Sequence, residues 1–225
     1  MKEGLAEGPI LWMTNVGSHM WKMQNKDSDI DLFVAYVVPT REYLKGRASK
    51  RSIAANYRNR DLVSHEIGKI IYMLVKGNVN FVWGITSPIV EYESGYLEEL
   101  KKIYVNNMSK NIYHSIHGLA IHNYRRYIKT GLDTSPKKIK TILRTVKFGI
   151  RILEKGEIKY KRVSGSPGPE DIKNAIAELE NAYENSNLPE TPNEELFYDF
   201  LYEIRIKEWI GRINDIHPLK VLYGW

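Results

Sequence analysis

The chain has 225 residues, 43% of them hydrophobic and none of them cysteine, and its basic residues exceed its acidic ones to give a net charge of +6. This composition excludes disulfides and thiolate metal sites, and it is typical of a chain that buries a sizeable core. No apolar run reaches the ~20 residues of a membrane-spanning helix and no export signal is recognisable, so we expect a cytoplasmic protein without a membrane partner. The basic excess favours polyanionic partners.

The first part of the chain predicts an α/β domain with a small mixed sheet. A short apolar run at residues 10–15 predicts a strand or the start of a helix. Residues 29–38 are apolar on both faces, which is typical of a central strand, and Pro39 ends it. A second short strand is predicted at residues 62–63, and the spacing of apolar residues predicts a helix over 66–76.

A strongly basic connection joins these two predicted strands. It covers residues 40–60, and we expect it to lie on the surface and either to cover a bound triphosphate or to follow an RNA backbone. The basic residues that this hypothesis uses are Arg41, Lys45, Arg47, Lys50 and Arg51. A plain exposed loop is the alternative for each of them.

A short buried element is predicted at residues 81–83, and from about residue 93 the pattern changes to helices. Apolar residues recur at helical spacing in five segments, 97–105, 112–128, 136–156, 170–185 and 193–213. Glycine and proline mark the turns between them. We therefore predict an α/β domain at residues 1–92 and an all-helical domain at residues 93–225.

The most informative motif precedes the first long strand. Gly17-Ser18 is followed by ten residues and then by Asp29-Ile30-Asp31. A glycine lets the backbone approach a phosphate closely, and a serine hydroxyl with N–H groups at a helix start can hold phosphate oxygens. Strand alternation points residues 29 and 31 to one face, roughly 6.5–7 Å apart, so both carboxylates can bind the same pair of cations. The motif predicts an enzyme.

This motif, with Val16 before it, resembles the signature of the DNA polymerase β nucleotidyltransferase superfamily. The resemblance implies that a hydroxyl attacks the α-phosphate of an NTP, ATP or GTP, and that pyrophosphate leaves. It also implies two Mg²⁺ ions, with Mn²⁺ as a possible substitute, which clamp the attacking and leaving oxygens. In this interpretation residues 1–92 are the catalytic domain and residues 93–225 bind the substrate.

Four blocks in order carry a narrower resemblance. They lie at residues 17–31, 61–78, 109–120 and 152–157, and they open with Gly17-Ser18, Asp61-Leu62-Val63, Ser109-Lys110-Asn111 and Ile152-Leu153-Glu154. Taken together, the blocks are similar to the polymerase β-like nucleotidyltransferases associated with RNA repair, a group often found beside RNA ligases. The resemblance implies an RNA substrate.

The candidate catalytic residues are three carboxylates. Asp29 and Asp31 are the metal ligands that the resemblance implies. A third carboxylate normally helps to bind the metal that activates the attacking hydroxyl; Asp61 is the first candidate and Glu66 the alternative. A turn residue or an ion pair with Arg60 is the other interpretation of Asp61, and a carboxylate that complements a helix N-terminus is that of Glu66.

The candidate nucleotide-binding residues come from two segments. Gly17 and Ser18 are expected to contact the triphosphate, with a simple helix cap as the alternative for Ser18. Lys69 and Lys76 lie seven residues apart on one predicted helix face, so both can point toward phosphates. A solvated helix face is the alternative for the two lysines.

The candidate nucleic-acid contacts lie in the helical part. Tyr113 and His114 share a predicted helix with Arg125 and Arg126, so a base can stack on Tyr113 while the arginines bind the backbone. A core tyrosine and a hydrogen-bonded histidine between helices are the alternative.

Three functions are compatible with these residues. The leading hypothesis is a Mg²⁺-dependent nucleotidyltransferase that acts on an RNA end during RNA or tRNA repair or processing. The second is transfer of AMP to a protein, or an antitoxin-like role. The third is a non-catalytic RNA-binding protein, against which the intact Gly17-Ser18 and both aspartates argue.

Overall fold

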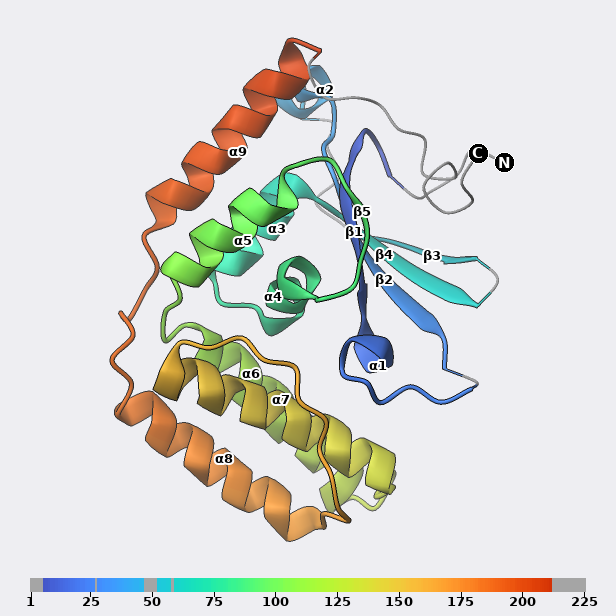
Figure 1. Ribbon diagram of the computed structural model, residues 1–225, viewed down its shortest axis with the longest axis vertical. Helices are drawn as coiled ribbons and strands as arrows, with labels where there is room; N and C mark the ends of the chain where they lie inside the picture. The colour runs from blue at the N-terminus through green and yellow to red at the C-terminus, as the bar shows by residue number, and fades with distance from the viewer. Residues whose placement is uncertain (1–5, 27, 47–51, 58, 212–225) are drawn as a thin grey trace. The chain divides into compact units, whose positions relative to one another are not determined.

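The structure is a computed structural model that describes residues 6–26, 28–46, 52–57 and 59–211 (Figure 1). It divides into two compact units. The first contains the sheet and is built from residues up to 74, residues 80–106 and residues from 193 onward, whereas the second contains residues 75–79 and 107–192. In the described part of the chain, no helix is long and apolar enough to span a membrane.

The described strands form one mixed sheet in the first unit. They are β1 (Ile10–Val16), β2 (Ile30–Tyr36), β3 (Ile53–Tyr57), β4 (Arg60–Glu66) and β5 (Val90–Glu93). Their order across the sheet is β3-β4-β2-β1-β5. β2 and β4 run parallel, while β1 is antiparallel to β2, and the edge strands β3 and β5 are antiparallel to their neighbours. This mixed sheet with helices confirms the predicted fold class.

Helices cover one face of this sheet at close range. The connecting helices of the first unit are α1 (Gly17–Met20), α2 (Thr40–Leu44), α3 (Ile67–Val75), α4 (Val79–Thr86) and α5 (Leu97–Asn106). α4 lies so close to β2 that a Cβ on Gly84 would overlap with the ring of Phe33. Thr14 Oγ1 on β1 donates a hydrogen bond of 2.6 Å to the Gly84 carbonyl, which holds the helix at this distance.

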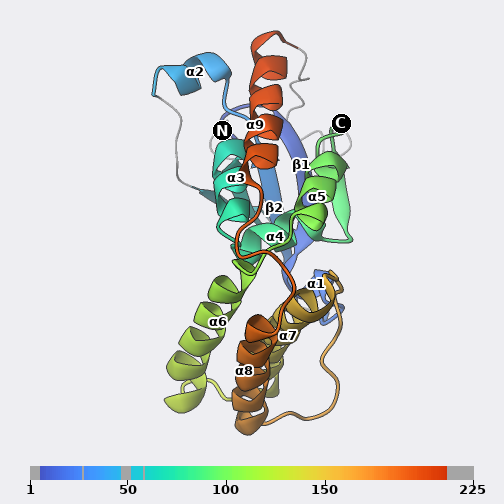
Figure 2. The same ribbon diagram turned by 90° about the vertical axis from the view of Figure 1, so that its left-hand side faces the viewer.

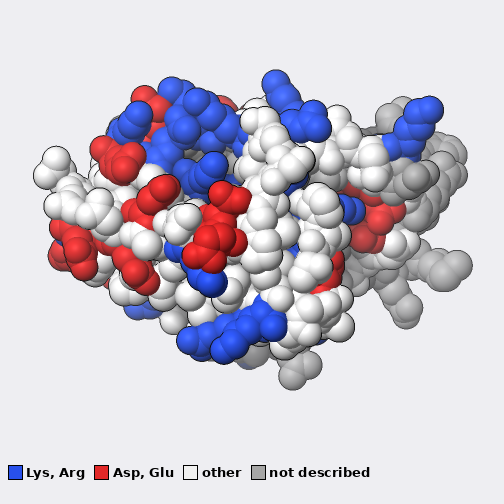
Figure 3. Space-filling model, turned by 90° about the horizontal axis from the view of Figure 1, so that it is seen from below, with Lys and Arg blue, Asp and Glu red and all other residues white. Residues whose placement is uncertain are grey.

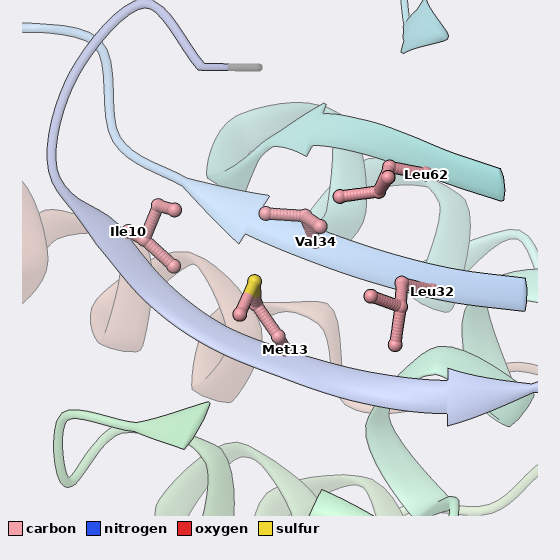
Figure 4. Packing of buried hydrophobic residues seen from close by; sticks show 5 residues of the cluster. All are labelled: Ile10, Met13, Leu32, Val34 and Leu62. Carbon is pink, nitrogen blue, oxygen red and sulfur yellow. The ribbon is translucent and has the colours of Figure 1, made fainter. Parts of the chain in front are cut away.

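The other face of the sheet carries a cluster of buried apolar side chains. Figure 4 shows that the cluster spans three adjacent strands, with Ile10 and Met13 on β1, Leu32 and Val34 on β2, and Leu62 on β4. Each of them is at most 2% exposed. Because both faces of β2 are buried, this strand is apolar along almost its whole length, as its sequence predicts.

The second unit is a set of packed helices. It contains α6 (Ile112–Asn123), a π-helical segment η1 (Tyr124–Lys129), α7 (Pro136–Lys155) and α8 (Pro169–Glu184). Figures 1 and 2 both show α7 beside α6 and α8, and the side chains of Ile116 and Leu179 close around Gly149. Ser135 caps α7 by accepting a hydrogen bond from Lys138 N, and Gly156 ends it with a φ of 59°.

The last described helix belongs to the first unit and not to the second. α9 (Glu194–Trp209) packs against α2 and α5, so the boundary expected near residue 92 lies inside the first unit. The helical periodicity of α9 was predicted, but periodicity does not tell which surface a helix packs against.

Four elements of the first unit differ from the prediction. The basic connection contains α2 and the edge strand β3, the segment 81–83 is part of the longer helix α4, and β5 was not predicted. Of the basic residues in the connection, Arg41 and Lys45 are exposed, whereas Arg47, Lys50 and Arg51 lie outside the described residues.

Candidate active site

Three aspartates lie at or just before the starts of β2 and β4. The parallel register places Asp31 directly opposite Asp61, and neighbouring strands lie about 4.8 Å apart with paired side chains on the same face. Asp29 precedes β2 by one residue and is exposed, while Asp31 and Asp61 are half-buried. Asn56 Nδ2 on β3 donates a hydrogen bond to Asp61 Oδ1, which orients that carboxylate. Sequence spacing predicts the pair 29 and 31, but only the register brings Asp61 to them.

Gly17 occupies the turn that borders this acidic group. Val16, the last residue of β1, pairs with Asp31, so the chain turns immediately beside the carboxylate. Gly17 has a φ of +64°, and a Cβ at this position would overlap with the carboxylate of Asp31. Both the backbone conformation and the contact therefore require glycine here. Ser18 follows in the short helix α1 and is half-buried.

Glu66 lies at the opposite end of β4. It pairs in register with Tyr36, five residues beyond the position of Asp61, which is about 16 Å along a strand. Its side chain is buried and forms a 2.5 Å ion pair with Arg205 of α9, and it also accepts a 2.7 Å hydrogen bond from Gly68 N. Glu66 is thus committed to a structural interaction, and the geometry favours Asp61 as the third carboxylate.

Lys69 is part of a hydrogen-bonded chain with Ser52 and His65. Lys69 Nζ lies 2.7 Å from Ser52 Oγ, which lies 2.8 Å from His65 Nδ1. Lysine only donates, so Ser52 Oγ accepts from Lys69, and it shares a second hydrogen bond with His65 Nδ1. The ring of His65 packs against those of Phe33 and Phe81, with ring centroids 4.8 and 4.6 Å away. Ser52 and His65 were not among the predicted site residues; His65 lies inside the block at residues 61–78, but nothing in the sequence indicates its contact with Ser52.

Lys76 lies beyond the end of α3. It is exposed and belongs to the segment assigned to the second unit, whereas Lys69 belongs to the first. The shared helix face that the sequence predicts for the two lysines therefore does not extend along one described helix, since α3 ends at Val75.

The titration of His65 is expected to make folding stability depend on pH. Burial, and to a smaller degree the charge of Lys69, lowers the pKa of His65 from 6.5 to about 4. Between these two pKa values the unfolded chain binds a proton that the folded chain does not, so stability falls as the pH drops from 7 to 5, by about 2 kcal/mol for this group. Urea unfolding of wild type and His65→Gln at both pH values measures the difference.

The matched control for this prediction is His122→Gln, because His122 is exposed. This control is expected to keep the pH dependence of the wild type. An equal loss of stability on acidification in His65→Gln and wild type would show that His65 does not cause it.

The predicted nucleic-acid contacts of the second unit have two different surroundings. The ring of Tyr113 stacks on Tyr183 and His117, with centroids 4.2 and 5.1 Å away, and is already part of a packed aromatic cluster. His114 is exposed. Arg125 and Arg126 are exposed at the start of η1 and line an open depression of about 630 Å³, together with His117, Gly118, Ile121 and His122. Figure 3 shows lysine and arginine side chains gathered in separate places, with acidic side chains between them.

The acidic group suits a hard divalent cation. Its donors are carboxylate oxygens, and the missing side chain of Gly17 lets the carboxylate of Asp31 pack directly against the turn. Among the described residues, no group of three or more histidine, aspartate or glutamate side chains is arranged so that it could hold a metal ion.

The chain is similar to known proteins in sequence and structure. Residues 3–193 match the model of the RlaP family, described as the RNA repair pathway DNA polymerase beta family. The uncharacterized protein MJ0002 of Methanocaldococcus jannaschii is 29% identical over 211 residues, which cover 79% of this chain and 86% of the relative. The crystal structure of a nucleotidyltransferase-like protein from Exiguobacterium sibiricum aligns over 87% of this chain and 73% of that one, with 14% identity and a TM-score of 0.33.

Proposed function

This chain belongs to the RNA repair pathway DNA polymerase beta family and is a nucleotidyltransferase of the polymerase β type, and from that premise we propose that it transfers an NMP from an NTP to a hydroxyl at an RNA end. ATP and GTP are the proposed donors, and pyrophosphate is the leaving group. The single observation that carries the proposal is the pairing of Asp31 with Asp61 beside the Gly17 turn.

Asp29, Asp31 and Asp61 are the proposed ligands of Mg²⁺, with Mn²⁺ as a possible substitute. When bound, two such ions would neutralise the charge that builds up on the phosphoryl oxygens and lower the pKa of the attacking hydroxyl. The chain itself contributes the positions of the carboxylates. The β2–β4 register sets the separation of Asp31 and Asp61, and Asn56 holds the carboxylate of Asp61 in place.

Gly17 and Ser18 are proposed to hold the triphosphate. The turn has no side chain at Gly17, so the backbone N–H groups can approach phosphate oxygens closely. Ser18 adds a hydroxyl donor beside them. Since the turn directly adjoins Asp31, a triphosphate bound there would have its α-phosphate near the carboxylates.

An RNA acceptor is supported by the family description and by charge. The chain carries a net charge of +6, and Arg125 and Arg126 lie exposed around an open depression whose other polar lining is histidine. Arginine guanidinium groups bind phosphates through paired N–H donors. We therefore propose that this part of the second unit contacts the RNA backbone, while Tyr113 acts as packing and not as a free stacking surface.

The decisive experiment follows label from each α-labelled NTP in the presence of Mg²⁺ and total RNA. Label on RNA with equimolar release of pyrophosphate, absent from the double variant Asp29→Ala/Asp31→Ala, is the expected result. Label on protein instead would identify a protein acceptor. The absence of any transfer, with tight RNA binding that the variant retains, would contradict the proposal and favour a non-catalytic RNA-binding protein.

Gly17→Ala is expected to reduce transfer about hundredfold. The added methyl group must displace the Asp31 carboxylate, and a misplacement of about 1 Å in an active site costs on that order. The positive φ adds a loss of roughly 1–3 kcal/mol in stability. Initial rates of pyrophosphate release and urea unfolding measure the two effects separately.

Gly95→Ala is the matched control for this variant. Gly95 also has a positive φ, of 96°, but a Cβ there meets nothing within 4 Å. It is expected to lose stability and keep its transfer rate. Equal rates for the two variants would mean that the space beside Asp31 does not matter.

A further inference from the structure

A strip of accessible side chains runs along one face of the two outer strands β3 and β4. Strand alternation and register put Asn56 opposite Asp61 and Ala54 opposite Val63 on this face. Asn56 and Ala54 are exposed, and so is Val63, with 39% of its surface accessible. An exposed apolar side chain between polar ones at the edge of a sheet suits the sugar and base surfaces of a nucleic acid strand.

The chain formed by Lys69, Ser52 and His65 closes the far end of this strip. Ser52 continues the same alternation from Ala54, and its contact with His65 confirms that it points to this face. His65 lies four residues beyond Asp61 on β4, which is about 13 Å along the strand. The strip therefore has a carboxylate group at one end and an ammonium group at the other.

Lys69 carries a positive charge without a carboxylate partner. Its side chain is half-buried and fixed by the 2.7 Å hydrogen bond to Ser52, yet no carboxylate of the described residues lies within ion-pairing distance. Ser52 Oγ accepts from Lys69 Nζ and is itself hydrogen-bonded to His65 Nδ1, so the hydroxyl is held from two sides and fixes the position of the ammonium group. The remaining two N–H donors of the ammonium group are available for an anion.

We propose that Lys69, held by Ser52, binds a backbone phosphate of the single-stranded RNA acceptor, and that the nucleotides between this phosphate and the reacting hydroxyl lie on the strip. This inference rests on the proposed RNA acceptor. A stacked strand rises about 3.4 Å per nucleotide, so about 13 Å corresponds to at most four nucleotides. The contacted phosphate is thus one of the four linkages next to the reacting end.

The first test measures RNA binding without catalysis. A fluorescent single-stranded oligoribonucleotide is titrated with protein in EDTA and without NTP, at several salt concentrations, and its anisotropy gives the affinity. Lys69→Gln is expected to weaken binding several-fold at low salt and to reduce the slope of log affinity against log salt by about 0.7, the value for one phosphate contact on a single strand. Lys102→Gln is the matched control, because Lys102 is an exposed lysine of the same unit and its substitution removes the same charge. This control is expected to change neither the affinity nor the salt slope.

The second test locates the phosphate. A neutral methylphosphonate is placed at each of the four linkages next to either end of the oligonucleotide. At one of these positions the methylphosphonate is expected to weaken RNA binding to the wild type but not to Lys69→Gln. A direct contact between Lys69 and that phosphate requires this non-additivity. Ser52→Ala keeps the charge of Lys69 but removes the hydrogen bond that fixes it. This variant is expected to weaken RNA binding less than Lys69→Gln does and to leave the salt slope unchanged. It replaces Lys69→Gln as the test if Lys69→Gln does not fold.

The outcomes separate this inference from the proposed function. If Lys69→Gln binds RNA with the affinity and salt slope of the wild type, or if it only raises the KM for NTP, the phosphate site is not an acceptor site, while label transfer to RNA still supports the function. If the wild type transfers no label to RNA and binds none, both are overturned.

Discussion

Asp31→Asn is expected to lower nucleotidyl transfer at least hundredfold while the protein stays folded. Asparagine has the shape of aspartate, so the close approach of Gly17 and the pairing with Asp61 are kept. The substitution removes the negative charge that would hold the cations at the phosphoryl group and replaces one acceptor oxygen by an NH2 donor. Loss of one preorganised group that stabilises transition-state charge costs about 10²–10³ in rate, and here the neutralised ligand is at the centre of the acidic group.

The measurement is the initial rate of pyrophosphate release with RNA and each NTP, together with circular dichroism and urea unfolding. Asp199→Asn is the matched control, because Asp199 is an exposed aspartate on α9 in the same unit. The control is expected to keep the full rate. An Asp31→Asn variant with near-normal turnover would remove Asp31 from the metal site and, with it, the main support for the proposed chemistry.

Arg205→Ala is expected to destabilise the first unit by about 3–5 kcal/mol. The variant leaves the carboxylate of Glu66, which is 4% exposed, buried without its cation. It also removes the 2.9 Å hydrogen bond to the Val38 carbonyl and the stacking of the guanidinium group over Tyr43. Urea unfolding at pH 7 measures the loss.

A control on the same helix separates burial from charge. Lys207→Ala removes the exposed ion pair of Lys207 with Glu203, which is 3.3 Å long, and it is expected to cost less than about 1 kcal/mol. The double variant Glu66→Gln/Arg205→Met is expected to be more stable than Arg205→Ala, because no buried charge remains. If Arg205→Ala and Lys207→Ala lose the same stability, α9 is not anchored by this ion pair.

The proposed acidic site rests on residues that are close together in sequence. Gly17, Ser18 and the two aspartates are close in sequence, and the strand that follows is apolar on both faces, so spacing and alternation together indicate the site. The choice between Asp61 and Glu66 is different. Asp61 and Glu66 each stand directly before apolar residues, so the sequence pattern does not separate them. The register of β4 against β2 and the distant partner Arg205 distinguish them.

The missed elements have a common physical reason. β3 and β5 are edge strands with one neighbour each and several exposed residues, so their sequences carry little of the apolar pattern that marks β2. α4 contains Gly84 for close contact with Phe33, and a glycine lowers helix propensity, which hides the helix from a pattern-based prediction. The hydrogen-bonded chain at Ser52 depends on strand pairing and has no signature in the sequence.

The order of the segments along the chain has a consequence for synthesis on the ribosome. α9 comes last in the described chain, yet it supplies the cation that Glu66 requires, and the whole second unit lies between them in sequence. The N-terminal part of a chain emerges from the ribosome first, so the strands of the sheet are synthesised early. The carboxylate of Glu66 then has no cation partner until residue 205 has been added. The second unit can fold during that interval, whereas the first unit completes its folding only after residue 205 has emerged.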